Sequence, residues 1–260
     1  MANPPDFSAI SRRGFLVGAS AVTAGAALGA CSSSDGGAGA PASTGQRPHS
    51  ALLPEDDWAA LRAQVGDRLI TVESPLAPCT IDATGDACSA ALSSLKNPFW
   101  IEATPGALQT NGWLDAWENQ ISPYAVAAES TADIAAAVNF AREKGIRLAV
   151  KGTGHDYLGR SNAADSLLVW THNMRDINFH KDFRPAGASA NTPPVKAISV
   201  GAGARWLGVY RVATTNGVYA QGGGCTTVGA CGGFTLGGGF GSFSKRFGSG
   251  AGSVLEMEVV

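Results

Sequence analysis

Apolar residues after position 120 alternate between strand-like runs and helix-like spacing. Short apolar runs predict buried strands at 125–127, 146–150, 166–170, 197–200 and 218–219. Residues 131–144 and 206–216 place apolar side chains at helical intervals, so each predicts a helix. Ser130 or Thr131 can cap the first helix, and Gly145 can end it. This alternation predicts an α+β or α/β architecture.

The part of the chain before this alternation is less regular. Residues 58–65 predict a short helix and residues 68–72 a short strand, whereas the stretch 79–88 is typical of a loop. We refer to residues 51–120 as the N-terminal extension. At the other end of the chain, residues 255–260 predict a strand that nothing terminates.

The start of the chain, residues 1–31, resembles a twin-arginine export signal. Two adjacent arginines precede an uncharged apolar run at 17–28, which is shorter than the about 20 residues that a membrane-spanning helix needs. Cys31 follows a Leu-Gly-Ala tripeptide that looks like a lipobox, in which the cysteine is acylated; a small-residue cleavage site is the alternative. Residues 32–50 are rich in Ser, Gly, Ala and Pro and predict a flexible linker.

Such a signal would deliver the protein to the periplasm, to the cell surface or outside the cell. In that oxidising setting Cys79 and Cys88 would form a disulfide, with two unrelated buried thiols as the alternative. Contact with a membrane is predicted only through a lipid on Cys31. The twin-arginine route carries folded proteins, which suits a protein that is loaded with a cofactor before export.

Composition and charge narrow the classes of function. The chain has 260 residues, of which 45% are hydrophobic, and a formal net charge of −2. This charge offers no basic surface for nucleic acid, which is excluded as a partner. Glycine occurs 34 times, well above its usual share of about 7 per cent, and is concentrated in particular segments.

Two glycine-rich segments are the candidate sites of chemistry. The first loop, residues 152–156, follows a predicted strand, and its glycines let backbone N–H groups surround an anion such as a pyrophosphate. The second loop, GGGCTTVG at 222–229, is followed by GGFTLGGGFG at 232–241. A flexible linker is a poor alternative, because core-type residues such as Val228 and Phe234 interrupt the glycines. The two segments together predict a bound planar group or a long phosphate chain.

These motifs carry a resemblance to a known family. The sequences VKGTGH at 150–155, CTTVG at 225–229 and GGGFG at 237–241 resemble the FAD-binding domain of the vanillyl-alcohol oxidase superfamily, and within it the berberine-bridge-enzyme-like oxidases. The resemblance covers about residues 123–260. It implies an α+β fold, a PCMH-type FAD-binding domain with two α/β subdomains (residues 121–260), and a chain that stops before the substrate domain.

The resemblance also implies the residues of the cofactor site. His155 would bond through a ring nitrogen to the 8α-methyl carbon of FAD, and Cys225 through sulfur to flavin C6, making the attachment bicovalent. The alternative for the Cys225 thiol is a disulfide with Cys231. The implied contacts with the cofactor come from Lys151, Gly152, Thr153, Gly154, His155, Asp156, Cys225, Thr226, Thr227, Val228, Gly229, Gly232, Gly233, Gly237 and Gly238.

The family's chemistry implies an FAD-dependent oxidoreductase that takes hydride from a small substrate such as an alcohol or a sugar, with oxygen as the electron acceptor. Residues that exchange the substrate proton would lie beyond Val260, so no catalytic residue is assigned, and no metal site is predicted. Two alternatives remain open. One is a flavin dehydrogenase that uses an acceptor other than oxygen, and the other is an exported binding protein without chemistry.

Overall fold

The main sheet has four strands in the order β1–β2–β4–β3. The computed structural model describes residues 53–112 and 120–260. The strands are β1 (Leu69–Thr71), β2 (Tyr124–Ala127), β3 (Arg147–Lys151) and β4 (Ser166–Trp170). Strand β4 runs parallel to both β2 and β3, and β1 is antiparallel to β2. All residues of β4 are buried, which explains its uninterrupted apolar sequence.

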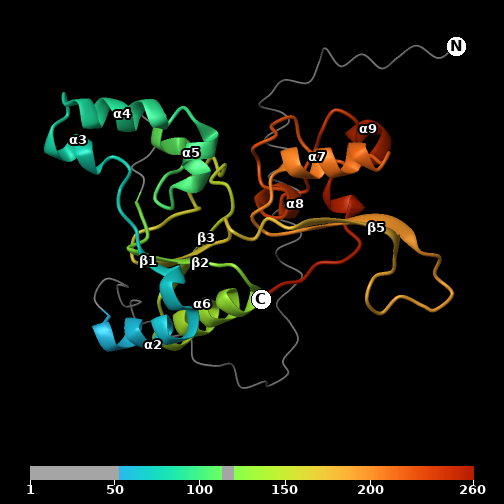
Figure 1. Cartoon of the computed structure of the whole chain (residues 1–260), viewed down its shortest axis with the longest axis horizontal. Helices are drawn as coiled ribbons and strands as arrows, with labels where there is room; N and C mark the ends of the chain where they lie inside the picture. The colour runs from blue at the N-terminus through green and yellow to red at the C-terminus, as the bar shows by residue number, and fades with distance from the viewer. Residues whose placement is uncertain (1–52, 113–119) are drawn as a thin grey trace, which may run out of the picture. The chain divides into compact units, whose positions relative to one another are not determined.

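Two helices cover one face of this sheet. Helices α2 (Glu55–Val65) and α6 (Thr131–Lys144) pack together there, and Trp58 of α2 stacks on Tyr124 of β2 with ring centroids 4.1 Å apart. Figure 1 shows helices α2 and α6 on one side of β1 and β2. Because α2 and β1 belong to the N-terminal extension, the first part of the extension shares its core with the residues that follow position 120.

Both ends of α6 follow from local sequence. The Ser130 hydroxyl accepts a hydrogen bond from the Asp133 N–H at 3.3 Å, and the Asp133 carboxylate accepts one from the Ser130 N–H at 3.1 Å. Gly145 adopts the left-handed conformation, with φ of 65°, and its N–H binds the last carbonyls of the helix. Of the two caps that the sequence allows, the structure therefore uses Ser130.

A second, two-stranded sheet follows the main sheet in the sequence. Strands β5 (Ile177–Phe183) and β6 (Val195–Val200) form an antiparallel pair, on which α7 (Trp206–Thr215) packs through Trp206 and Val209. Two single-turn helices, α8 (Gly233–Leu236) and α9 (Ser244–Phe247), lie within the glycine-rich region. The described residues also contain short 3-10 turns at Gly66–Arg68, Gln109–Gly112 and Ala251–Ser253.

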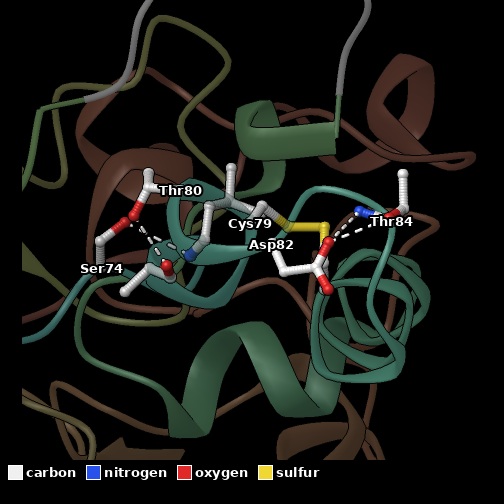
Figure 2. The surroundings of a disulfide bond; sticks show 8 residues. Ser74, Cys79, Thr80, Asp82 and Thr84 are labelled. Carbon is white, nitrogen blue, oxygen red and sulfur yellow. Dashed lines mark hydrogen bonds between the residues drawn. A yellow bond between two sulfur atoms is a disulfide. The ribbon is translucent and has the colours of Figure 1, made fainter.

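The cysteines of the extension connect two short helices (Figure 2). The sulfur atoms of Cys79 and Cys88 are 2.06 Å apart, which is disulfide-bond distance, and they join α3 (Ala77–Ile81) to α4 (Asp86–Ser94). Helix α5 (Pro98–Ala103) follows, capped by Asn97, whose Oδ1 accepts from the Phe99 N–H at 3.0 Å.

Three local expectations were wrong. The stretch 79–88 is largely helical, because α3 and α4 occupy most of it. Residues 218–219 form no strand, since they directly follow a turn at Gly217, with φ of 62°, and have no strand to pair with. Residues 255–260 are exposed and form no strand in the described part of the chain.

The mixed helices and sheets confirm the predicted α+β class. No helix among residues 53–112 and 120–260 has the length and hydropathy that crossing a membrane requires. The predicted export signal, with Cys31, and the linker at 32–50 that follows it lie outside the described residues.

Candidate functional site

The first loop begins where β3 ends. Thr171, which follows β4, donates its N–H to the Lys151 carbonyl at 2.9 Å, so the loop starts at the ends of the two adjacent strands. Within the described residues, the N–H groups of residues 152–156 donate no hydrogen bond to protein. Gly154 has φ of 81°, and a Cβ there would lie 3.1 Å from the Lys151 Cε. The loop therefore requires glycine at 154 and leaves its N–H groups available to an anion.

His155 is the polar centre of this region. Its Nδ1 lies 2.7 Å from the Gln109 Oε1, and its Nε2 lies 3.0 Å from the Thr227 Oγ1. Burial lowers the pKa of His155, an effect that the carboxylate of Glu102 and a hydrogen bond to the Thr227 backbone partly oppose. The imidazole is therefore neutral near pH 7 and retains one lone pair, as a nucleophile or a metal ligand needs.

The fold brings the two glycine-rich loops together. Thr153 accepts a hydrogen bond at its Oγ1 from the Gly229 N–H at 2.9 Å, and Arg205 forms an isolated β-bridge with Gly229. The carbonyls of Thr226 and Val228 accept the first N–H groups of α7 at 2.9 and 3.0 Å. These bonds direct the two carbonyls toward α7, so the second loop is held between that helix and the first loop.

Cys225 and Cys231 have different surroundings and are not joined. Cys225 is exposed, and its Sγ lies 3.3 Å from the same Thr227 hydroxyl that contacts His155. The Sγ of Cys231 instead lies 3.1 Å from the Val200 carbonyl of β6. Burial raises the pKa of Cys231 to about 11, because a thiolate would lose hydration there. The structure therefore places one thiol next to the hydroxyl that contacts His155 and the other against β6.

We expect the two thiols to differ in reactivity. In the folded, flavin-free protein at about pH 8, iodoacetamide should label Cys225 first, while Cys231 should react at least about a hundredfold more slowly than after unfolding, since its thiolate is suppressed. Timed alkylation followed by peptide mass spectrometry measures both rates, and the same protein in urea is the control. Equal labelling of the two cysteines in the folded protein would contradict this arrangement.

The glycines of the second segment serve two purposes. A Cβ at Gly222 would lie 2.5 Å from the Trp206 ring, and one at Gly241 only 2.0 Å from a backbone oxygen, so both glycines are required by packing. A Cβ at Gly224, Gly232 or Gly233 would meet nothing within 4 Å. Gly238 is equally open and has φ of 95°, whereas Gly237 ends α8. Only the open positions present bare main chain to a ligand.

The side chains of two predicted site residues bind other protein groups. The Lys151 ammonium is fully buried and donates to four carbonyls of residues 101–107, at 2.6 to 3.3 Å. Burial lowers the pKa of Lys151 to about 7, with Glu102 opposing the shift. Asp156 pairs with Arg160 at 2.7 Å, and these hydrogen bonds lower the pKa of Asp156 although burial acts against them. Lys151 thus anchors the extension, and Asp156 closes the end of the loop.

Sequence reasoning missed the residues of the extension that reach this site. Gln109 contacts His155, and Glu102, 1% exposed, accepts a hydrogen bond from Arg175 at Oε1. The same oxygen lies 3.4 Å from the His172 Nδ1, and the other carboxylate oxygen, Oε2, lies 3.4 Å from the Arg205 Nε. No periodicity or motif marks either residue, because their partners are distant in the sequence.

Comparisons with known proteins agree on one family. Residues 122–260 match the family model described as FAD binding domain. An uncharacterized FAD-linked oxidoreductase of Arthroderma benhamiae is 36% identical, over 79% of this chain and 39% of its own length. The FAD-linked oxidoreductase penH of Penicillium thymicola is 33% identical, over 78% of this chain and 38% of its own length. The chain thus spans about two fifths of the length of these curated relatives.

A solved structure shows the same fold. The VAO-type flavoprotein MtVAO713 of Myceliophthora thermophila aligns with a TM-score of 0.66 and 30% identity, over 78% of this chain and 39% of that chain.

Proposed function

This chain belongs to the FAD-binding domain family of VAO-type flavoproteins, and on that premise we propose that it forms the flavin-binding part of an FAD-dependent oxidoreductase with a covalently attached cofactor. The observation that carries the covalent attachment is the setting of His155. This side chain is neutral and half-buried at the meeting point of the two glycine-rich loops, with Cys225 on the other side of a shared hydroxyl.

The residues present fit FAD. Available N–H groups at 152–156 can bind a diphosphate, since consecutive backbone donors form an anion-binding concavity. The open glycines at 224, 232 and 233 allow a flat ring to approach the main chain closely. We assign the diphosphate to the first loop and the flavin ring to the second segment. Lys151 and Asp156 hold the first loop in place through their hydrogen bonds to the N-terminal extension and to Arg160, respectively.

FAD, when bound, supplies a two-electron acceptor for hydride from an organic substrate. The chain's own residues hold it. The neutral His155 ring would supply a lone pair for a bond to the 8α carbon, and the Cys225 thiol a sulfur for a bond at C6. Each bond would replace one flavin C–H bond, and the two protons and two electrons released would pass to oxygen, the proposed acceptor, which leaves as peroxide. The Thr227 hydroxyl lies 3.0 Å from His155 and 3.3 Å from Cys225, so one group orients both side chains.

For the whole enzyme we propose a small organic substrate such as an alcohol or a sugar, and oxygen as the acceptor that restores the flavin. The relatives' name of FAD-linked oxidoreductase supports the reaction class. A dehydrogenase that uses another acceptor is the alternative. Measured oxygen consumption during substrate oxidation separates the two.

Peptide mass spectrometry on the purified protein, extended to its natural downstream residues where the gene encodes them, tests the attachment. We expect adducts of FAD mass on the peptides that contain His155 and Cys225. An adduct on the His155 peptide alone would remove Cys225 from the proposal. A colourless protein without any adduct would overturn covalent flavin binding and favour the exported binding protein without chemistry.

We also propose that the protein is exported by the twin-arginine route and carries a Cys79–Cys88 disulfide outside the cytoplasm, with Cys31 acylated as a lipid anchor. The structure brings Cys79 and Cys88 together, and a disulfide between them would persist in an oxidising compartment. Membrane fractionation after metabolic labelling with a fatty acid would test the anchor.

A further inference from the structure

The N-terminal extension binds the first loop at two points through one residue. The Gln109 N–H donates to the Gly154 carbonyl at 3.1 Å, and the Gln109 Oε1 lies 2.7 Å from the His155 Nδ1. Backbone and side chain of Gln109 thus contact adjacent residues of the loop.

The side-chain contact determines where the imidazole proton resides. An amide oxygen only accepts hydrogen bonds, so Nδ1 of the neutral His155 ring must carry the proton and donate it to Gln109. Nε2 then keeps the lone pair and accepts from the Thr227 hydroxyl at 3.0 Å. With both ring nitrogens bonded, the ring has one orientation and one proton position.

Gln109 is itself held in place by buried neighbours. Ala107 and Leu108 immediately before it are 0% exposed, and the Lys151 ammonium donates to the Ala107 carbonyl at 2.7 Å. Leu108 also donates its N–H to the Asn111 Oδ1. Lys151 ends β3, so the same strand end fixes both the loop that carries His155 and the segment that carries Gln109.

We propose that Gln109 is a positioning residue that sets the orientation and the proton position of His155, which makes the N-terminal extension part of the flavin-attachment site. The consequence for attachment rests on the proposed function. The contact itself does not, so the two can be tested separately.

Nitrogen NMR of the imidazole rings in the flavin-free chain tests the contact directly. The chain has four histidines, and a His155→Asn variant identifies the signal. We expect the Nδ1–H tautomer in the wild type and a mixture of both tautomers in Gln109→Leu. An unchanged tautomer in Gln109→Leu would overturn the proposal. This readout needs no flavin, so it decides the role of Gln109 even if the wild type forms no adduct and the proposed function fails.

The rate of covalent flavin incorporation provides the second readout. Gln109→Leu should slow it about tenfold through loss of one partly buried hydrogen bond. Gln64→Leu is the matched control, because Gln64 is exposed on α2 and should leave the rate unchanged. Gln109→Glu should restore the orientation, while its negative charge raises the pKa of His155 and moves the pH profile of incorporation upward. Wild-type rate and pH profile in both Gln109 variants would contradict the proposal.

Discussion

Replacing His155 with asparagine is expected to abolish the flavin adduct on the peptide that contains residue 155. Asparagine has no ring nitrogen with nucleophilic character, whereas the neutral imidazole of His155 does. In a protein that also carries Cys225→Ser, no flavin should remain after acid precipitation, and non-covalent binding should persist because the N–H groups of the first loop are unchanged. Fluorescence of the precipitated protein and peptide mass spectrometry measure the loss.

His180→Asn is the matched control for this variant. His180 lies on β5 and bonds the Ser199 hydroxyl at 2.8 Å, away from both loops, so its replacement should leave the adduct intact. An undiminished adduct on the residue 155 peptide in the His155→Asn protein would remove His155 from the proposed site. Loss of the adduct in both variants would indicate a general effect on folding.

Replacing Glu102 with glutamine is expected to lower the free energy of unfolding by about 3 kcal/mol. The Glu102 carboxylate is 1% exposed and faces Arg175, Arg205 and His172, and its charge also raises the pKa of the buried Lys151. Glutamine keeps the shape but removes the charge, so the two arginines lose their anionic partner. The three surrounding side chains are partly exposed. We therefore expect a loss of stability at the lower end of the range for breaking a buried ion pair.

Urea unfolding followed by tryptophan fluorescence measures this change. Glu143→Gln on the exposed side of α6 is the control and should change the free energy of unfolding by less than about 0.5 kcal/mol. Equal stability of the Glu102→Gln and Glu143→Gln proteins would show that the cluster around Glu102 contributes little to folding. Reduced flavin binding that accompanies the Glu102→Gln loss would link the extension to the site.

Local interactions made much of the fold predictable. Helix α6 has a capping residue, an acidic residue three positions later and a terminal glycine, all of which act within a few residues. Strand β4 is apolar throughout because it is central and covered on both faces. Strand β5 was missed because none of its residues is buried, so its pairing with β6 leaves only a weak pattern.

The sequence by itself also determined the α+β class, the two glycine-rich loops and His155 and Cys225 as candidate groups. These predictions depend on residue types at short spacing along the chain, so they can be made without a structure. Only the tertiary structure decided that Thr227 lies between these two side chains, that Cys231 turns toward β6, and that Gln109 binds His155. These are contacts between segments far apart in the chain, which are fixed by how the strands and the extension pack and leave no local pattern.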